Sequence, residues 1–127
     1  MAALLLTVAS CTGETEKKQA EVLKKLAAET PLFPGFEKTG ENLVLKSGLV
    51  YYFNHYSSKT DFSSVKAFYD PALAQRNWKS EEEVAPSSSF VGPPHRVSYR
   101  RGDYVIAIAQ DDRGIAVFDV VFEWDPQ

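Results

Sequence analysis

Apolar residues recur at helical spacing in residues 14–29, where they form a single narrow stripe. The stripe consists of Ala20, Leu23, Leu26 and Ala27. Thr30 and Pro31 end it, because the residue before a proline disfavours helical backbone. We therefore expect an N-terminal helix that docks lightly on the rest of the protein and turns a charged face to solvent.

A second and broader stripe at helical spacing lies in residues 62–73. Its apolar members are Phe62, Val65, Phe68, Tyr69, Ala72 and Leu73. Asp61 is suited to cap the start of this helix, and Asn77 suits the left-handed position after its end. Pro71 should bend or restart the helix, with Asp70 able to cap the second part.

Elsewhere apolar and polar residues alternate, which is typical of strands with one buried face. In the clearest case, residues 49–56, one face carries Val50, Tyr52, Asn54 and Tyr56. Strands are predicted in the segments 43–45, 49–56, 78–84, 96–101, 103–110 and 115–124. A helix, strands, a second helix and then a run of strands is the element order of an α+β fold.

We therefore expect a single antiparallel sheet of about five strands with helices packed on one face, preceded by the N-terminal helix. Residues 31–127 should form one globular domain. Its core should join the second helix to the last strand, which has the broadest apolar face in the chain. The expected packing partners are Val65, Phe68, Leu73 and Trp78 on one side and Phe118, Val120 or Phe122 on the other.

Composition narrows the functional classes. The chain has 127 residues and a formal net charge of −3, so no overall positive field attracts nucleic acid. No apolar run reaches the roughly 18 residues of a membrane-spanning helix. The single cysteine, Cys11, excludes an internal disulfide and a zinc site with several cysteine ligands. No motif indicates a metal or an organic cofactor.

Cys11 follows a short apolar run that has the length of a signal-peptide core. The run ends in Val8-Ala9-Ser10-Cys11, which is an aliphatic residue, two small residues and a cysteine. This quartet resembles the lipobox of bacterial lipoproteins. After the cysteine the composition changes from apolar to polar: the next seven residues contain no large apolar side chain.

The lipobox resemblance implies that residues 1–10 are a signal peptide and that Cys11 begins the mature protein with lipid on its sulfur. Residues 11–30 would then be the lipidated tether and N-terminal helix. Several acyl chains give stable anchoring, so the domain would be held at a membrane of the bacterial envelope, facing the periplasm or the exterior. In the alternative interpretation, the N-terminus is a buried helix or strand and Cys11 is a small core residue.

A second resemblance concerns the globular part. The matching stretches are Leu32-Phe33-Pro34-Gly35-Phe36, Asp61-Phe62-Ser63-Ser64-Val65-Lys66-Ala67-Phe68-Tyr69, Leu73, and Asn77-Trp78. They look like a family of small exported bacterial proteins of unassigned function. Phe33 stands where tyrosine is usual in that family, and Asn77 stands where glycine is usual. The resemblance supports the fold and implies no chemistry.

Catalytic and metal-binding motifs are not evident. The two histidines, His55 and His95, lie far apart in sequence, and neither belongs to an HxH or HExxH motif. The run 81–83 consists of three glutamates, but consecutive strand residues point to alternate faces and cannot converge on one ion. We expect this run to be a solvated edge strand, whose charge discourages edge-to-edge pairing.

Two groups of side chains are candidate binding residues. Arg96 and Arg100 should share one strand face and Tyr99 the other; guanidiniums beside an aromatic ring can hold phosphate, carboxylate or a lipid head group. In the alternative, the arginines pair with the glutamates of 81–83. Tyr52 and Tyr56 form a row that either lines a groove for a sugar, peptide or protein, or packs under a helix.

Three functional hypotheses follow. The first is a non-catalytic envelope lipoprotein that is anchored through Cys11 and interacts with an envelope protein or the cell wall. The second is a carrier of a lipid or another small apolar molecule, which needs a cavity between sheet and helices. The third, an enzyme, needs polar groups that converge in a cleft, and we expect it least.

Overall fold

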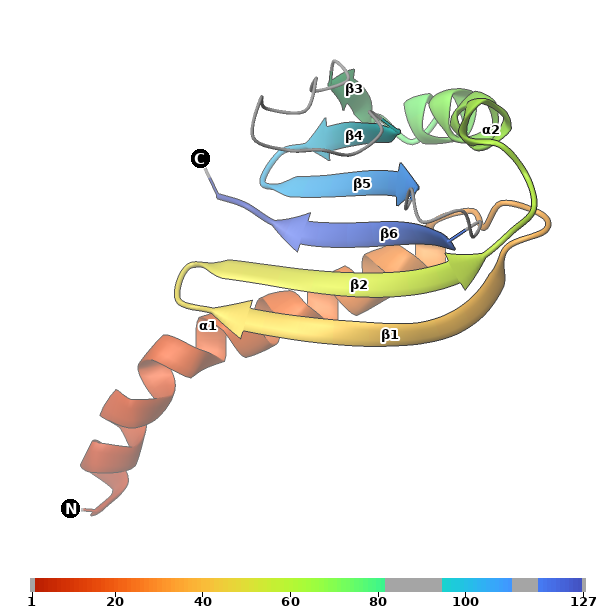
Figure 1. The fold of residues 1–127 in the computed structure, drawn as a ribbon. Coiled ribbons are helices and arrows are strands. Elements are labelled where there is room, and N and C mark those ends of the chain that lie inside the picture. The colour runs from red at the N-terminus through yellow and green to blue at the C-terminus, as the bar shows by residue number, and fades with distance from the viewer. Residues whose placement is uncertain (1, 82–94, 111–116, 127) are drawn as a thin grey trace, which may run out of the picture.

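A computed structural model describes residues 2–81, 95–110 and 117–126, with side chains from Gly13 onward. The element order is α1 (Ala2–Glu29), β1 (Glu37–Lys46), β2 (Leu49–Ser57), α2 (Phe62–Ala74), β3 (Lys79–Glu81), β4 (Arg96–Arg101), β5 (Tyr104–Gln110) and β6 (Val117–Trp124). The strands form one sheet in the order β1-β2-β6-β5-β4-β3 (Figure 1). The protein is therefore α+β with one sheet, as predicted.

All neighbouring strands in the sheet are antiparallel. β1 and β2 form a hairpin, and β3 to β6 form a meander whose last strand returns to pair with β2. At the hairpin turns, Gly48 and Gly102 have φ angles of 80° and 62°, which side chains other than glycine rarely tolerate. The pairing of β6 with β2 joins the hairpin and the meander into one layer.

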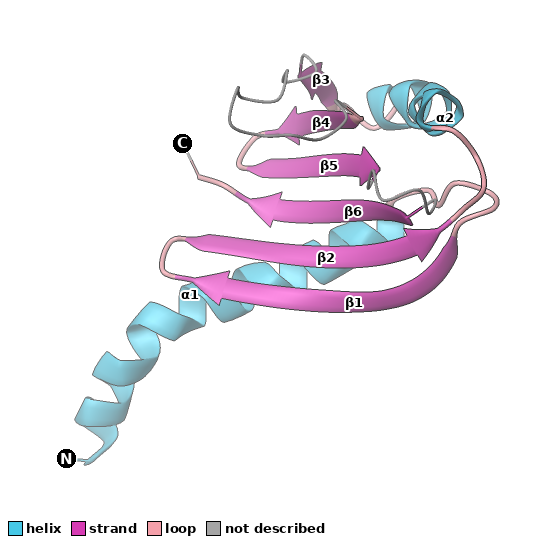
Figure 2. Cartoon of the chain, in the orientation of Figure 1, coloured by secondary structure: helices cyan, strands magenta, loops and turns pink. Residues whose placement is uncertain are grey.

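Both helices lie on the same face of the sheet (Figure 2). Gln19 of α1 accepts a hydrogen bond from the Tyr104 hydroxyl at 2.7 Å, and Asp70 of α2 accepts one from the Tyr99 hydroxyl at 2.7 Å. These two tyrosines project from the same face of β5 and β4. α1 crosses β1, β2 and β6, whereas α2 lies toward the β3 and β4 side of the sheet (Figure 1).

The predicted alternation of strand residues is confirmed. On β2 the residues facing the helices, Val50, Tyr52, Asn54 and Tyr56, are all buried, and their neighbours are only half-buried. On β6 the buried residues are Phe118, Val120 and Phe122. The sheet therefore has a helix-covered face and an opposite face, which we call the outer face.

The six strands agree with the six predicted segments and are close to the expected number of about five, but β1 runs from Glu37 where the sequence indicated only residues 43–45. Its first half is mostly exposed and polar, so no apolar alternation marks it. A register shift between Lys38 and Gly40 interrupts the pairing with β2. Pairing with β2, rather than side-chain burial, extends this edge strand. The predicted ends 82–84 and 115–116 lie outside the described residues.

α1 docks more closely than its narrow stripe suggested. Leu23 is 0% exposed and Ala20 is buried with it. Nearer the N-terminus, a carboxylate oxygen of the buried Glu16 accepts a hydrogen bond from the Gly48 backbone N–H at 3.1 Å, in the β1–β2 turn. Its other oxygen, Oε1, has no hydrogen-bond partner in the described part of the chain. Few apolar residues suffice because polar contacts along α1 supplement them.

α2 begins and ends as predicted. The Asp61 side chain accepts a hydrogen bond from the Ser64 N–H at 3.0 Å, and Asn77 has a left-handed φ of 67°. The Trp78 N–H then bonds to the Leu73 carbonyl at 3.0 Å, which returns the chain toward the core.

The expected break at Pro71 does not occur, because α2 continues from Phe62 to Ala74 with Pro71 inside it. Pro71 is exposed, so its ring faces solvent in the last turns of the helix. Asp70 caps no second segment. Its carboxylate instead accepts hydrogen bonds from Lys66 at 2.7 Å and from Tyr99 at 2.7 Å.

The predicted core is confirmed except at one position. Val65, Leu73 and Trp78 are buried in one cluster with Phe118, Val120 and Phe122. Phe68 is only partly buried at the edge of this cluster, where it meets Phe33 edge-on at 5.4 Å. Tyr69, 1% exposed, occupies the central position instead. Phe68 and Tyr69 are adjacent and both fit the helical spacing of the stripe. The sheet lies on the side of α2 that carries Tyr69, so Tyr69 is the residue that becomes buried.

Replacing Trp78 by alanine should lower the free energy of unfolding by about 3–5 kcal/mol, because the ring is buried and leaves a cavity. Phe68→Ala should cost clearly less, since part of that ring is already exposed. Leu45→Ala, at a side chain 44% exposed, is the matched control and should change little. Urea denaturation of the three variants measures this order, and an equal cost for Trp78 and Phe68 would contradict the burial described above.

Candidate functional site

Tyr52 and Tyr99 lie on the helix-covered face and are already engaged. The Tyr52 hydroxyl donates to Glu41 at 2.7 Å, and the Tyr99 hydroxyl donates to Asp70 at 2.7 Å. Tyr99 is 0% exposed and offers no surface to a ligand. For Tyr52, the structure shows the arrangement expected of a tyrosine that packs under a helix.

The contact between Tyr99 and Asp70 connects α2 to β4. Burial, together with the hydrogen bond to the Asp70 carboxylate, raises the pKa of Tyr99 well above its usual range. Burial opposes ionisation of Asp70, but hydrogen bonds from Lys66 and Tyr99 outweigh it and lower the pKa of this carboxyl. The phenol therefore remains a donor and the carboxylate remains charged, as a structural hydrogen bond between them requires.

Arg96 and Arg100 share one strand face and Tyr99 lies on the other, as predicted. Arg96 and Arg100 project from the outer face, whereas Arg101 lies on the helix-covered side, with its guanidinium 4.4 Å from the centroid of the Trp78 ring. Arg100 pairs with Asp125 at 2.9 Å and with Glu81 at 3.6 Å. The closer partner thus comes from beyond β6, and the predicted partners at 82–83 lie outside the described residues.

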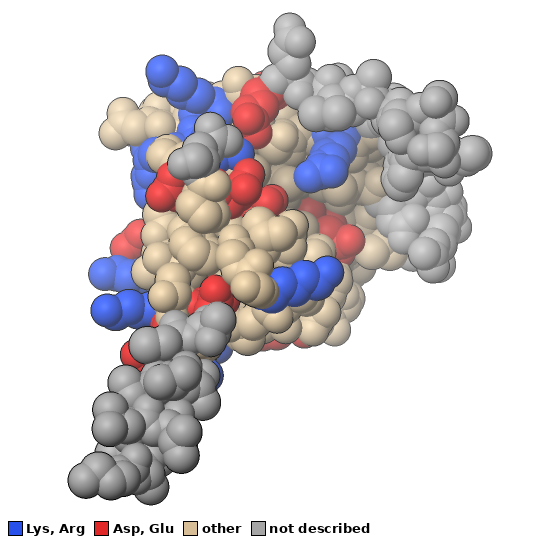
Figure 3. Space-filling model, turned by 90° about the vertical axis from the view of Figure 1, so that its left-hand side faces the viewer, with Lys and Arg blue, Asp and Glu red and all other residues tan. Residues whose placement is uncertain are grey.

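Glu123 adds a third carboxylate to this region of the outer face, beside Asp125 and Glu81. Burial raises the pKa of Glu123 and the nearby Asp125 raises it further, while Arg96 and Arg100 act in the opposite direction. Acidic and basic side chains are interspersed on the side of the molecule that carries the C-terminus, rather than sorted into separate patches (Figure 3). Such a surface suits a partner with both signs of charge better than a polyanion.

An aromatic row lies beside these charges on β2. Tyr51 and Phe53 have ring centroids 6.0 Å apart, and Phe53 stacks on His55 at 6.3 Å with an interplanar angle of 15°. The Nδ1 atom of His55 lies 2.6 Å from a carboxylate oxygen of Asp119 on β6. Gly40 is the register partner of His55 on β1 and places no side chain against the ring.

The pair formed by His55 and Asp119 was not predicted from the sequence, because 64 residues separate its members. The available signal was the alternation of each strand, which places both residues opposite the buried face but does not reveal the register that brings them together. A carboxylate at Nδ1 fixes the orientation of an imidazole. His95 does not join this pair; its ring lies 5.4 Å from Phe62 at the start of α2.

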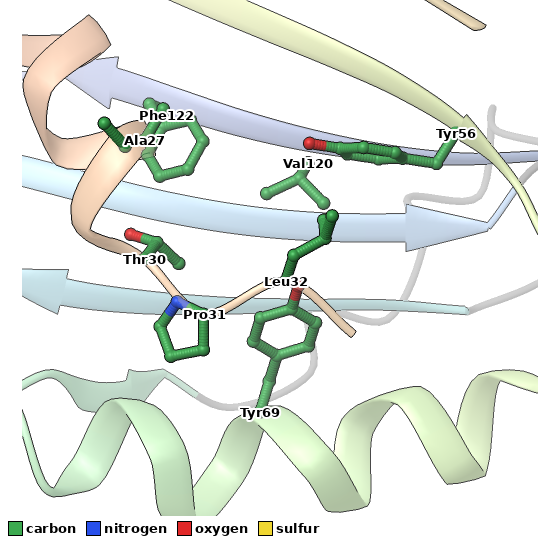
Figure 4. Close-up of a pocket in the computed structure, with 9 residues that line it drawn as sticks. Ala27, Thr30, Pro31, Leu32, Tyr56, Tyr69, Val120 and Phe122 are labelled. Carbon is green, nitrogen blue, oxygen red and sulfur yellow. The ribbon is translucent and has the colours of Figure 1, made fainter. Parts of the chain in front are cut away.

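Tyr56, the remaining candidate, lines a hollow between the two helices and the sheet (Figure 4). The hollow has a volume of about 210 Å³. Its lining residues come from α1, the segment after it, β2, α2 and β6, and they are Ala27, Ala28, Thr30, Pro31, Leu32, Tyr56, Tyr69, Val120 and Phe122. On its other side the Tyr56 ring stacks on Phe36 at 4.9 Å. The carrier hypothesis would be favoured by a closed apolar cavity, whereas this hollow is open to solvent beside Leu32, which is 51% exposed.

No family model, curated protein or solved structure matches this chain. The resemblances to bacterial lipoproteins and to small exported proteins therefore rest on their quoted motifs. Within the described ranges, no group of three or more histidine, cysteine, aspartate or glutamate residues could hold a metal ion. No helix in the described part of the chain has the length and apolar character needed to cross a membrane.

The carboxylates of Glu123 and Glu41 should affect stability with opposite signs. The raised pKa of Glu123 means that its ionised form is less favourable in the folded chain, so Glu123→Gln should increase the free energy of unfolding near neutral pH. The gain should vanish below about pH 4, where the carboxyl is protonated in both states.

Glu41→Gln is the control of opposite sign. Hydrogen bonds from Lys38 and Tyr52 lower the pKa of Glu41, so its contribution is present above the unfolded pKa and is lost as pH falls. This variant should be less stable than the parent at neutral pH and equal to it in acid. Thermal denaturation at both pH values tests the pair, and destabilisation by Glu123→Gln at neutral pH would contradict the unfavourable, half-buried environment of this carboxyl.

Proposed function

We propose that this protein is a non-catalytic lipoprotein of the bacterial cell envelope, anchored by lipid on Cys11 and interacting with an envelope protein or the cell wall. The observation that carries the proposal is the quartet Val8-Ala9-Ser10-Cys11 after an apolar run. The place along the chain where the folded core begins is consistent with this proposal. The first described core residue is Ala20, so cleavage before Cys11 leaves this core intact.

The attachment of α1 supports a short tether. Glu16 is buried against the β1–β2 turn, and only five positions separate it from Cys11. That stretch spans about 7.5 Å as a helix and about 17 Å when extended. A lipid on Cys11 would therefore hold the domain against the bilayer surface, with the β1–β2 turn toward the membrane.

The outer face is the surface we assign to a macromolecular partner. It combines the half-buried rings of Tyr51 and Phe53 with the pair of His55 and Asp119 and with the arginines of β4. Aromatic and arginine side chains are the residues that contribute most at protein interfaces. A partner that contacts these strands would not need to displace either helix.

Catalysis is the function that the described residues favour least. The pair of His55 and Asp119 resembles part of a general-base arrangement, but a base needs a nucleophile or a bound substrate within hydrogen-bond reach. The ring neighbours found for His55 are Phe53 and Gly40, which supply no reacting group. The carrier function is the second candidate, and the hollow beside Tyr56, which lies between the sheet and the helices, is the observation that favours it.

Protein purified from the envelope of the native host should begin at Cys11 and carry thioether-linked lipid, and mass spectrometry of the N-terminal peptide measures both. Cys11→Ser should move the protein from the membrane fraction to the soluble fraction without lowering its thermal stability. Ser10→Thr, which keeps a small residue before the cysteine, is the control. An unmodified chain that retains Met1 would refute the lipoprotein assignment.

The short tether predicts how the anchored domain is oriented. Fluorophores attached at Ser47→Cys, in the β1–β2 turn, and at Lys59→Cys, beyond the other end of β2, should be separated by about 25–30 Å along the strand. In vesicles containing head-group quenchers, the lipidated protein should show strong quenching at position 47 and weak quenching at position 59. The same labels on the soluble Cys11→Ser chain provide the control, and equal quenching of both labels on the lipidated protein would contradict a short tether.

A further inference from the structure

The hollow results from the way two helices share one sheet face. α1 covers β1, β2 and β6, and α2 lies toward β3 and β4, so the middle of the sheet is left to the segment that follows α1 (Figure 1). The side chains of Ala27 and Ala28 are too small to fill this space, and Pro31 turns the chain across it. Val120 and Phe122 of β6 form an apolar wall (Figure 4).

Two tyrosine hydroxyls line this space. The Tyr69 oxygen accepts a hydrogen bond from the Phe33 backbone N–H at 3.0 Å, so its own hydrogen remains to be donated. Neither Tyr69 nor Tyr56 donates to an acceptor in the described part of the chain. An acceptor placed in the hollow could therefore take a hydrogen bond from each of these hydroxyls.

The remaining lining residues exclude a charged occupant. The only titratable side chains in the wall are the two tyrosines, and burial raises the pKa of Tyr69 to about 12 and also raises that of Tyr56. Both hydroxyls are therefore neutral donors at physiological pH. Transfer of an ion into such a site would be costly, because no counter-charge is present among the lining residues.

The volume sets the size of the occupant. An apolar cavity of about 150 Å³ holds benzene, so about 210 Å³ has room for a ring with a small substituent. Pockets for larger ligands run to about 300–1,000 Å³. Leu32 is 51% exposed and lies on the wall, so the hollow borders the surface at this residue.

We propose that the hollow is a binding site for a small neutral molecule that has an apolar body of about one ring and an uncharged carbonyl or ether oxygen. The body would pack on Val120 and Phe122, and the oxygen would accept hydrogen bonds from the Tyr69 and Tyr56 hydroxyls. This site is independent of the lipid on Cys11, and it goes beyond the proposed envelope role by assigning a ligand class to the helix-covered side of the sheet.

Two probes of the same shape test the proposal. Acetophenone carries a carbonyl oxygen, and α-methylstyrene carries a methylene group in its place. Titration of the isotope-labelled protein, followed by amide chemical shifts, should give saturable changes that cluster around Ala27, Leu32 and Val120 for acetophenone. α-Methylstyrene should bind about twofold to tenfold more weakly, the ratio that corresponds to roughly one net hydrogen bond.

Variants then assign the contacts. Tyr69→Phe and Tyr56→Phe should each reduce the preference for acetophenone over α-methylstyrene, whereas Tyr51→Phe on the outer face should leave the preference unchanged. Ala27→Leu should fill the hollow and weaken both probes, and Ala67→Leu, on the exposed side of α2, is its matched control. These readouts compare two ligands on one folded protein, so a loss of stability in a variant does not imitate the expected result.

Several outcomes would overturn the proposal. They are the absence of saturable shifts with acetophenone, shifts that cluster away from the lining residues, equal affinity for the two probes, and unchanged binding to Ala27→Leu. Equal affinity would show a merely apolar hollow whose hydroxyls are satisfied by water. None of these results bears on lipidation, which the analysis of the N-terminal peptide decides separately.

Discussion

The antiparallel pairing of β6 with β2 is the interaction on which the rest of the structure depends. It places Tyr52 opposite Phe122 and Tyr56 opposite Phe118, so the hairpin and the meander present one continuous apolar face to both helices. Strand side chains alternate between faces, so a slip of one residue would turn the phenylalanines of β6 outward and bring Asp119 and Glu123 under α1. The cost of burying two carboxylates without partners makes the register strongly specified.

The same register creates the polar features of the outer face. Because Phe118 and Phe122 point toward the helices, Asp119 and Glu123 must point away, where Asp119 meets His55 and Glu123 lies near the arginines of β4. Their positions therefore follow from core packing, and no separate constraint on the outer face is needed to explain them. A surface of this origin has alternating aromatic and charged side chains, which is how Tyr51, Phe53 and the ion pairs of Arg100 come to lie on the same side.

The spacing of apolar residues and the residue types at helix ends were sufficient to predict individual helices, their caps and the buried faces of strands. Periodicity located α2 and the buried faces of β2 and β6, and the caps Asp61 and Asn77 were recognisable because each requires a particular residue type at one position. Features that depend on strand register, or on how several segments meet, were not predictable. The first half of β1 has no apolar alternation, and helical spacing alone could not decide between Phe68 and Tyr69 as the central core residue. The hollow depends on the positions of five separate elements, which no stretch of sequence specifies.

α1 connects the β1–β2 turn, near the proposed anchor, to the hollow that we propose as a ligand site. Its stretch near Glu16 is fixed to the β1–β2 turn on the side of Cys11, and its last turn supplies Ala27 and Ala28 to the wall of the hollow. Between these points the helix is held by Leu23 in the core and by the hydrogen bond from Tyr104 to Gln19. A helix fixed at three places along its length cannot shift at one end alone. Small alanines at its last turn leave space that a single larger side chain would fill, and filling a cavity is among the changes that commonly stabilise a protein. The cost of leaving the space open therefore falls on the same helix that, in the proposed role, would position the domain at the membrane, so that the proposed ligand site and the proposed anchor would share one element.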